Sequence, residues 1–183
     1  MKILAFAGTN SSLSINKKLI KFALQNFKDD SIEFLDLKDY EMPLFSIDLE
    51  KVEQPKNAFY FLQKIESCDG IICSLAEHNK SYTVAFKNLL DWCSRINGKV
   101  FQNKPMFLMA TSTGEYGGGN VLNTAKTFFP MFGADIKADF SLPTFDLNFD
   151  ENRGITNADK LKEFNEKINV FKDSLKSSDT TWL

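Results

Sequence analysis

Residues 2–16, KILAFAGTNSSLSIN, carry the signals that decide the fold. The apolar run 2–7 predicts a short strand, and Gly8 ends it. A loop rich in hydroxyl and amide side chains follows at once and leads into a stretch with apolar residues at helical spacing. A first strand that passes through a polar, glycine-started loop into a helix favours an open α/β sheet with parallel strands.

Short apolar runs alternate with amphipathic stretches along the rest of the chain. The run at 70–75 has almost no polar residue, which predicts a strand with both faces covered. Apolar and polar residues alternate at 136–142, which predicts a strand with one solvated face at a sheet edge. Thr156 or Asn157 can cap the last helix. Together the patterns predict strands at 2–7, 32–37, 70–75, 105–110 and 136–142, and helices at 16–27, 56–66, 84–96, 121–132 and 161–175.

Five strands that alternate with five helices predict a parallel sheet with helices on both faces, because right-handed crossovers place them there. We expect an α/β protein, a flavodoxin-like three-layer sandwich with five strands in the order 2-1-3-4-5. Residues 1–176 would form a single domain, with a loop at 143–154 and a loose tail at 177–183. Ligands of such sheets bind beyond the carboxyl ends of the strands, so the loops to inspect are 8–16, 75–84 and 111–120.

Composition excludes several classes of protein. The 183 residues carry 22 Lys and Arg against 24 Asp and Glu, a net charge of −2 with no basic block, which argues against a nucleic-acid or membrane partner. No apolar stretch is long enough for a signal-peptide core or a membrane span. With His78 as the only histidine and no C-x-x-C pair, we expect no metal site, and reduced thiols in a cytoplasmic protein. The three cysteines are Cys68, Cys73 and Cys93.

The first loop, 8–16, predicts an anion site. It contains neither G-x-G-x-x-G nor a Walker lysine, so it lacks both a dinucleotide fingerprint and an NTPase loop. It does place several hydroxyl and amide side chains at a helix N-terminus, where N–H groups and the helix dipole favour phosphate. Ser14 would equally well do no more than cap that helix. The residues alone leave both interpretations open.

The second loop follows the buried run 70–75 and is crowded with polar groups. Glu77, His78 and Asn79 could hydrogen-bond a flat heterocycle, although composition alone slightly favours ordinary exposed polar side chains. No second His and no strained Ser turn are present, so nothing indicates a nucleophile triad.

The third loop, 111–120, is rich in glycine. Gly114, Gly117, Gly118 and Gly119 would let a ligand ring approach the backbone closely, and they expose N–H groups at another helix start. The alternative is a merely flexible loop. The buried-type strand that feeds it makes ligand binding the favoured interpretation.

Taken together, the three loops resemble the motifs of the NAD(P)H-dependent FMN reductase family, the group that includes chromate, quinone and azo-dye reductases with a flavodoxin-like fold. The similarity spans roughly residues 2–172. The motif G-S-x-R-x-x-S-x-N is met by Gly8, Ser14 and Asn16, with Thr9 in place of its first Ser. The motif P-E-Y-N-x-S-x-P-G-x-L-K-N-A-I-D-W is met by Glu77, Asn79, Ser81, Lys87, Asn88, Asp91 and Trp92. The motif S-x-G-x-x-G-G is met by Ser112, Gly114, Gly117 and Gly118.

The chain departs from the family's pattern at three places. Ser11 replaces an Arg, which removes a cation near the phosphate; His78 replaces a Tyr; and Thr83-Val84 replaces Pro-Gly, so the turn there must differ. Residues 87–92, the helical part of the second motif, would hold a neighbouring loop or a subunit contact.

The resemblance implies an FMN-dependent oxidoreductase, with the phosphate on the first loop and the ring against the other two. NADH or NADPH would be the co-substrate, and a quinone, azo compound, metal oxyanion or free flavin the acceptor. No catalytic side chain and no metal ligand are implied. The implied cofactor-binding residues are Gly8, Thr9, Ser14, Ile15, Asn16, Glu77, His78, Asn79, Ser81, Ser112, Thr113, Gly114, Gly117 and Gly118.

The family also implies a homodimer or homotetramer. Its members associate through the helix after the second motif, where Asp91, Trp92 and Arg95 match, and the alternative is that Trp92 packs inside its own subunit. Two other functions stay open at this point. One is a non-enzymatic flavodoxin-type electron carrier, and the other is a member of the family that has lost flavin binding.

Overall fold

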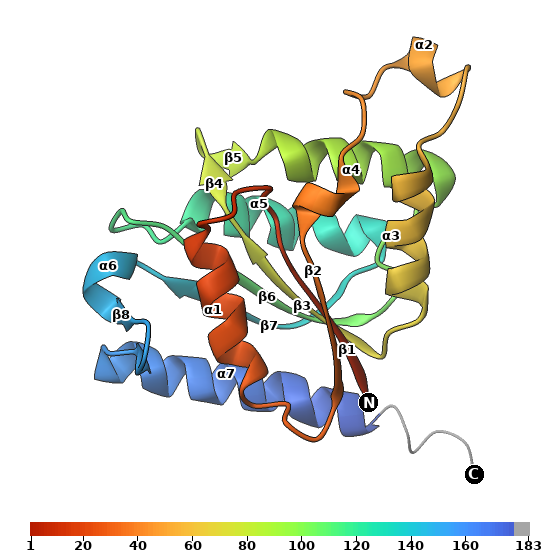
Figure 1. Cartoon of the computed structure of the whole chain (residues 1–183). Coiled ribbons are helices and arrows are strands. Elements are labelled where there is room, and N and C mark those ends of the chain that lie inside the picture. The colour runs from red at the N-terminus through yellow and green to blue at the C-terminus, as the bar shows by residue number, and fades with distance from the viewer. Residues whose placement is uncertain (178–183) are drawn as a thin grey trace.

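The computed structural model describes residues 1–177 and contains a central parallel sheet between two layers of helices (Figure 1). The strand order β2-β1-β3-β6-β7 confirms the predicted order 2-1-3-4-5. All four pairings in the sheet are parallel. The strands are β1 (Lys2–Ala7), β2 (Ser31–Leu35), β3 (Gly70–Leu75), β6 (Pro105–Thr111) and β7 (Asp135–Leu142).

Alternate residues of the strands enter two separate cores, as the two-residue period of a strand requires. In β1, Ile3 and Ala5 face one helical layer, while Leu4 and Phe6 face the other. The first layer consists of α1 (Ile15–Leu24) and α7 (Ala158–Ser177). The second consists of α3 (Lys56–Glu66), α4 (Val84–Ile96) and α5 (Gly119–Phe128). The loops that follow β1, β3 and β6 therefore meet at one edge of the sheet, as expected for parallel strands.

Several predicted boundaries hold and others shift for local reasons. The strands 2–7 and 70–75 and the helices 56–66 and 84–96 are confirmed. The second strand ends at Leu35 instead of 37, because the Asp36 side chain accepts from Lys38 N and starts the 3₁₀ helix η1 (Leu37–Tyr40). The predicted helix 121–132 divides into α5 and the 3₁₀ helix η2 (Phe129–Phe132), with Pro130 at the start of η2.

Asn157, not Thr156, caps α7, because its side chain accepts from Lys160 N at 3.0 Å. The predicted tail 177–183 lies outside the described residues, apart from Ser177 at the end of α7. Among residues 1–177, no helix has the length and apolar character needed to span a bilayer.

Six short elements in three segments of the chain were also not predicted. A hairpin, β4 (Glu77–His78) and β5 (Ser81–Tyr82), occupies the second loop and turns at Asn79 and Lys80, which have φ values of 50° and 64°. The predicted loop 143–154 contains α6 (Phe145–Asn148), β8 (Phe149–Asp150) and β9 (Gly154–Ile155). The helix α2 (Ile47–Glu50) lies on a segment that stands away from the rest of the molecule in Figure 1.

Candidate functional site

The three loops selected from the sequence meet in a cavity of about 330 Å³ beyond the ends of β1, β3 and β6. Thr111 and Ala76 form part of its wall. Eight of the sequence-predicted site residues line it. They are Thr9, Ser14, Ile15, Asn16, Glu77, His78, Ser112 and Thr113.

The other six predicted residues lie around this cavity and not in its wall. Gly8 is buried, and its N–H donates to Ser74 O at 2.8 Å. Asn79 and Ser81 are exposed on the hairpin, and Gly114 is exposed at the tip of the third loop. Gly117 and Gly118, later in the same loop, are buried.

In the first loop, the side chains cap α1 and leave the helix end open to an anion. Ser14 Oγ accepts from Lys17 N at 3.4 Å, which makes Ser14 the N-cap. The N–H groups of Ile15 and Asn16, at the first helical positions, have no acceptor inside the helix. A hydroxyl that accepts one hydrogen bond still has its own proton to donate. The capping role of Ser14 and a ligand role are therefore compatible.

The buried side chain of Asn16 hydrogen-bonds the first helix to two strands, and we call this contact the Asn16 clamp. Its Oδ1 accepts from Ser74 Oγ at 2.7 Å and from Thr111 N at 3.1 Å, and its Nδ2 donates to Thr111 O at 3.1 Å. The side chain is only 2% exposed. Because these bonds use most of its hydrogen-bonding capacity, Asn16 mainly fixes the geometry of the cavity. Ser74 was missed from the sequence, although it is the one hydroxyl in the apolar run 70–75.

Thr83 joins the second loop to the first. Its Oγ1 donates to Gly8 O at 2.8 Å, and the same oxygen accepts from Phe86 N at 3.2 Å as the N-cap of α4. Thr83 stands where the resembling family has Pro, so the altered turn is closed by a side-chain cap. A threonine directly before an amphipathic stretch is the local signal that would have identified it.

Glu77 points its carboxylate at the start of α5. One oxygen accepts from Asn120 Nδ2 at 3.0 Å, and the other accepts from Val121 N at 2.9 Å. Gly118, the N-cap of α5, provides no side-chain capping bond. Glu77 therefore links the second loop to the helix that follows the third loop.

The glycines of the third loop serve the turn and the packing. Gly117 and Gly118 have φ values of 57° and 76°, and a side chain on Gly118 would meet Ala110 Cβ at 3.0 Å. A side chain on Gly114 would meet only Ser112 Oγ, at 3.8 Å. Of these three glycines, only Gly114 therefore leaves room beside the backbone for a ligand. Phe145 N donates to Ser112 O at 3.0 Å, so hydrogen bonds hold the loop in place.

A second cavity, of about 470 Å³, lies on the other side of His78, which lines both cavities. Its wall combines polar and apolar side chains, with Leu37, Met42 and Leu89 among the apolar ones. Glu41 is the only carboxylate in the wall, which contains no Lys or Arg.

The helical part of the second motif is structural. Trp92 is fully buried and donates from Nε1 to Pro43 O at 2.8 Å. Asn88 Oδ1 accepts from Phe45 N at 2.8 Å, so both side chains hold residues 42–45 against α4. The expected subunit contact through Trp92 is therefore wrong, because the indole packs inside its own chain.

The three thiols are buried and unsuited to chemistry. Burial raises the pKa of Cys68 to about 11 and that of Cys93 to about 12, and it also raises the pKa of Cys73. Within residues 1–177, no group of three or more His, Cys, Asp or Glu side chains could hold a metal ion. The cavity thus offers neutral hydrogen-bond donors, a helix N-terminus and two polar loops.

Comparison with known proteins agrees with this geometry. Residues 1–146 match the family described as NADPH-dependent FMN reductase. The chain is 32% identical over 124 residues to NADH-dependent flavin reductase subunit 2 of Lactobacillus johnsonii, covering 64% of this chain and 63% of that protein. It is also 32% identical over 124 residues to NADPH:quinone oxidoreductase of Arabidopsis thaliana, covering 65% of this chain and 61% of that protein. These matches span less than two thirds of either relative.

A solved structure shares the fold over nearly the whole chain. FerB of Paracoccus denitrificans, a flavoenzyme NAD(P)H:(acceptor) oxidoreductase, matches with a TM-score of 0.76. The match covers 96% of this chain and 97% of that chain, at 21% identity.

Proposed function

Because the chain belongs to the NADPH-dependent FMN reductase family, we propose that it is an oxidoreductase that holds FMN and takes hydride from NADH or NADPH. Electrons then pass to a small acceptor, such as a quinone, an azo compound, a metal oxyanion or free flavin. Bound FMN supplies the redox chemistry, and the protein supplies its binding and orientation. The observation that carries the proposal is the cavity where a helix N-terminus meets two polar loops at the ends of β1, β3 and β6.

The first loop would hold the phosphate with neutral donors. Gly8 would shape the turn, the hydroxyl groups of Thr9 and Ser14 would face the anion, and the backbone N–H groups of Ile15 and Asn16 would donate to it at the positive end of α1. No Lys or Arg lines the cavity.

The buried lysine beside the first loop does not supply the missing cation. Lys17 Nζ lies 2.7 Å from both carboxylate oxygens of Asp36 and is neutralised there. A single phosphate site with no pyrophosphate loop favours FMN over FAD.

The second and third loops would flank the ring. From the second loop, we assign Glu77, His78, Asn79 and Ser81 to this side. From the third loop, we assign Ser112, Thr113, Gly114, Gly117 and Gly118. Backbone N–H groups near Gly114 would stabilise negative charge on the reduced ring. The N–H of Gly117 already donates to Gly114 O at 3.2 Å, which leaves that role to its neighbours. No side chain is assigned as an acid or base.

The second cavity would admit the acceptor. It adjoins the first cavity at His78, and a wall that combines apolar side chains such as Leu37, Met42 and Leu89 with polar groups suits a flat, neutral aromatic molecule with a few polar atoms. With Glu41 present and no cation in the wall, a metal oxyanion fits this cavity less well than a quinone. Because this cavity would admit a small-molecule acceptor, we favour the function of a reductase over that of a flavodoxin-type carrier, which passes electrons to protein partners.

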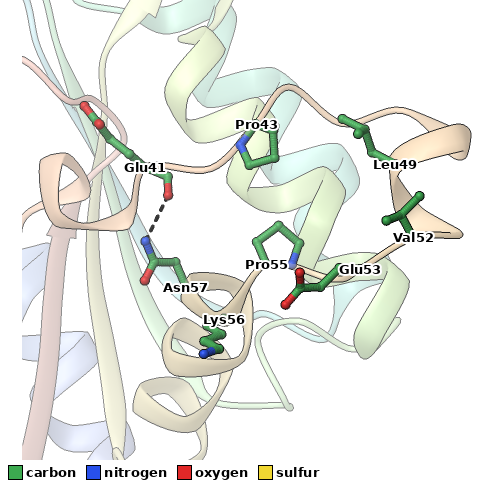
Figure 2. Close-up of a pocket in the computed structure, with 8 residues that line it drawn as sticks. All are labelled: Glu41, Pro43, Leu49, Val52, Glu53, Pro55, Lys56 and Asn57. Atoms are coloured by element: carbon green, nitrogen blue, oxygen red, sulfur yellow. Dashed lines mark hydrogen bonds between the residues drawn. The ribbon is translucent and has the colours of Figure 1, made fainter.

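We place the subunit contact on residues 42–55, which we call the arm. Residues 42–45 of the arm lie against α4, and Figure 1 shows its outer part, with α2, standing away from the body. Ile47 and Val52 on the arm are 64% and 82% exposed. Figure 2 shows Pro43, Leu49, Val52 and Pro55 around a cavity of about 450 Å³ beneath it. Exposed apolar side chains on a projecting segment suit a homodimer, or a homotetramer built from it.

Light scattering tests the dimer. Wild type should have the mass of a dimer or tetramer, and the paired change Ile47→Glu with Val52→Glu should yield monomer. Val170→Glu on α7, a matched change at a 52% exposed valine, should leave the mass unchanged. A monomeric wild type at micromolar concentration would overturn this assignment.

The three cysteines are free thiols, as is usual in a reducing compartment, and on that basis we place the protein in the cytoplasm. The function itself is tested by calorimetric titration with FMN, FAD and riboflavin, followed by assays of NADH or NADPH oxidation with a quinone. FMN should bind more tightly than FAD, and the loaded protein should catalyse the oxidation. Absence of FMN binding, or equal binding of FAD, would contradict the proposal.

A further inference from the structure

The carboxylate of Glu77 closes an otherwise uncapped helix end. Both oxygens are used, one by Asn120 Nδ2 at 3.0 Å and the other by Val121 N at 2.9 Å. α5 begins at Gly119 after a glycine N-cap in the left-handed region, which has no side chain to satisfy the first N–H groups. Glu77, 44 residues before Val121 in the chain, supplies this cap from a different loop. A carboxylate at a helix N-terminus is also stabilised by the helix dipole.

This contact connects the two loops that flank the proposed ring site. On one side, the third loop is fixed by Thr144 N donating to Gly114 O and Phe145 N donating to Ser112 O, both at 3.0 Å. On the side toward the hairpin, the start of α5 is held by Glu77. The hairpin itself is anchored to the first loop through Thr83. The separation of the second and third loops therefore depends on Glu77.

We infer that Glu77 is a positioning residue: it sets the width of the slot between the second and third loops by capping α5, and it acts on the flavin through that helix. The inference rests on the proposed function, because the slot matters only if a ring occupies it. Its consequence is specific to the ring. Loss of the Glu77 cap weakens the binding of FMN and of riboflavin by the same factor, since both carry the ring. Loss of a donor in the first loop weakens the binding of FMN alone, since riboflavin has no phosphate.

Two substitutions separate capping from charge. In Glu77→Gln, the amide oxygen still accepts from Val121 N–H, so most of the cap survives without the charge. In Glu77→Ala, both acceptors are lost. We expect Glu77→Ala to weaken the binding of FMN and of riboflavin by about tenfold or more. This factor corresponds to one net hydrogen bond of about 1.4 kcal/mol. Glu77→Gln should weaken both by less than about fivefold.

A double-mutant cycle and amide hydrogen exchange give readouts independent of activity. Asn120→Ala removes one partner of the carboxylate, so its effect should be smaller in the Glu77→Ala background than in wild type. Exchange at the amides of residues 112–121 should accelerate in Glu77→Ala even without flavin. Glu166→Ala, at an exposed site on α7, is the matched control and should change neither affinity nor exchange in 112–121. If Glu77→Ala does not fold, Asn120→Ala with Glu77→Gln provides the same comparison.

The outcomes are distinct. If the wild-type protein does not bind FMN, the proposed function is wrong. Faster amide hydrogen exchange in Glu77→Ala would still establish that Glu77 caps α5. If wild type binds FMN but Glu77→Ala binds both flavins as wild type does, the inference is wrong. It is equally wrong if Glu77→Gln is as damaging as Glu77→Ala with unchanged exchange, because Glu77 would then act on the ligand by its charge.

Discussion

Replacing Asn16 by Ala should destabilise the whole domain. The change removes three buried hydrogen bonds, two accepted by Oδ1 and one donated by Nδ2. At about 1 kcal/mol of net stability each, the loss is about 3 kcal/mol. That is a large part of the roughly 5–15 kcal/mol by which domains are stable. For a chain of this size, each kcal/mol lowers Tm by roughly 2–4 °C, so Tm should fall by about 6–12 °C.

Differential scanning calorimetry of the ligand-free protein measures this fall. Asn123→Ala, an exposed asparagine on α5, is the control and should stay within about 0.5 kcal/mol of wild type. FMN and riboflavin should be affected alike by Asn16→Ala, because the clamp shapes the cavity as a whole. A Tm within 1–2 °C of the Asn123→Ala variant would refute the reasoning. So would a selective loss of FMN affinity, which would make Asn16 a phosphate ligand and not a clamp.

Four further outcomes are expected. Ser14→Ala should lower the affinity for FMN, measured by calorimetry, by about tenfold to a hundredfold, because one hydroxyl donor to a charged phosphate is lost. The affinity for riboflavin should stay unchanged. Asp36→Asn should lower unfolding free energy in urea by about 2 kcal/mol, since it leaves the buried Lys17 ammonium unpaired. Burial raises the pKa of Asp36, but the hydrogen bonds from Lys17 and from Lys38 N, together with the charges of both lysines, more than offset this, so the folded-state pKa is lowered. The stabilisation is therefore present above about pH 4 and lost below it. Kinetics should show similar kcat/KM for NADH and NADPH, because Ser11 replaces the cation that the 2′-phosphate usually needs. Native protein should not react with a thiol reagent at pH 8 until unfolded, which exposes Cys68, Cys73 and Cys93.

A specific result would contradict each of these four expectations. Equal weakening of FMN and riboflavin by Ser14→Ala would reduce Ser14 to a helix cap. Unchanged stability of Asp36→Asn at neutral pH would mean that Lys17 finds water instead. A strong preference for NADPH would point to another cation, with Lys80 on the exposed hairpin turn as the first candidate. Rapid labelling of a thiol in native protein would show that the core opens easily.

The sheet and its order could be predicted because they depend on patterns that are local in the sequence. The runs 2–7 and 70–75 carry their strand signals within six residues. The ends of helices and strands were predicted less well where a side chain overrides the apolar pattern. Asp36 ends β2 early by capping η1, although its neighbour Leu37 continues the apolar alternation.

The contacts that organise the site could not be predicted, because their partners are distant in sequence. Asn16 meets Thr111 across 95 positions, and no local pattern records that pairing. The predicted role of Trp92 in a subunit contact was wrong for the same reason. A large aromatic beside charged residues on a helix is typical of an interface, but residues 42–45 fold over the indole and Pro43 O accepts its N–H. The sequence thus located the loops, while the structure decides which of their side chains face a ligand.

The central claim is that the cavity formed by the three loops holds a flavin that is reduced by a nicotinamide. The most direct test is the visible absorbance of the FMN-loaded protein without oxygen, recorded after NADH or NADPH is added and again after a quinone. We expect the absorbance of oxidised flavin to disappear with the nicotinamide and to return with the quinone. A protein that binds no FMN, or whose bound FMN keeps its absorbance with both nicotinamides, would contradict the claim.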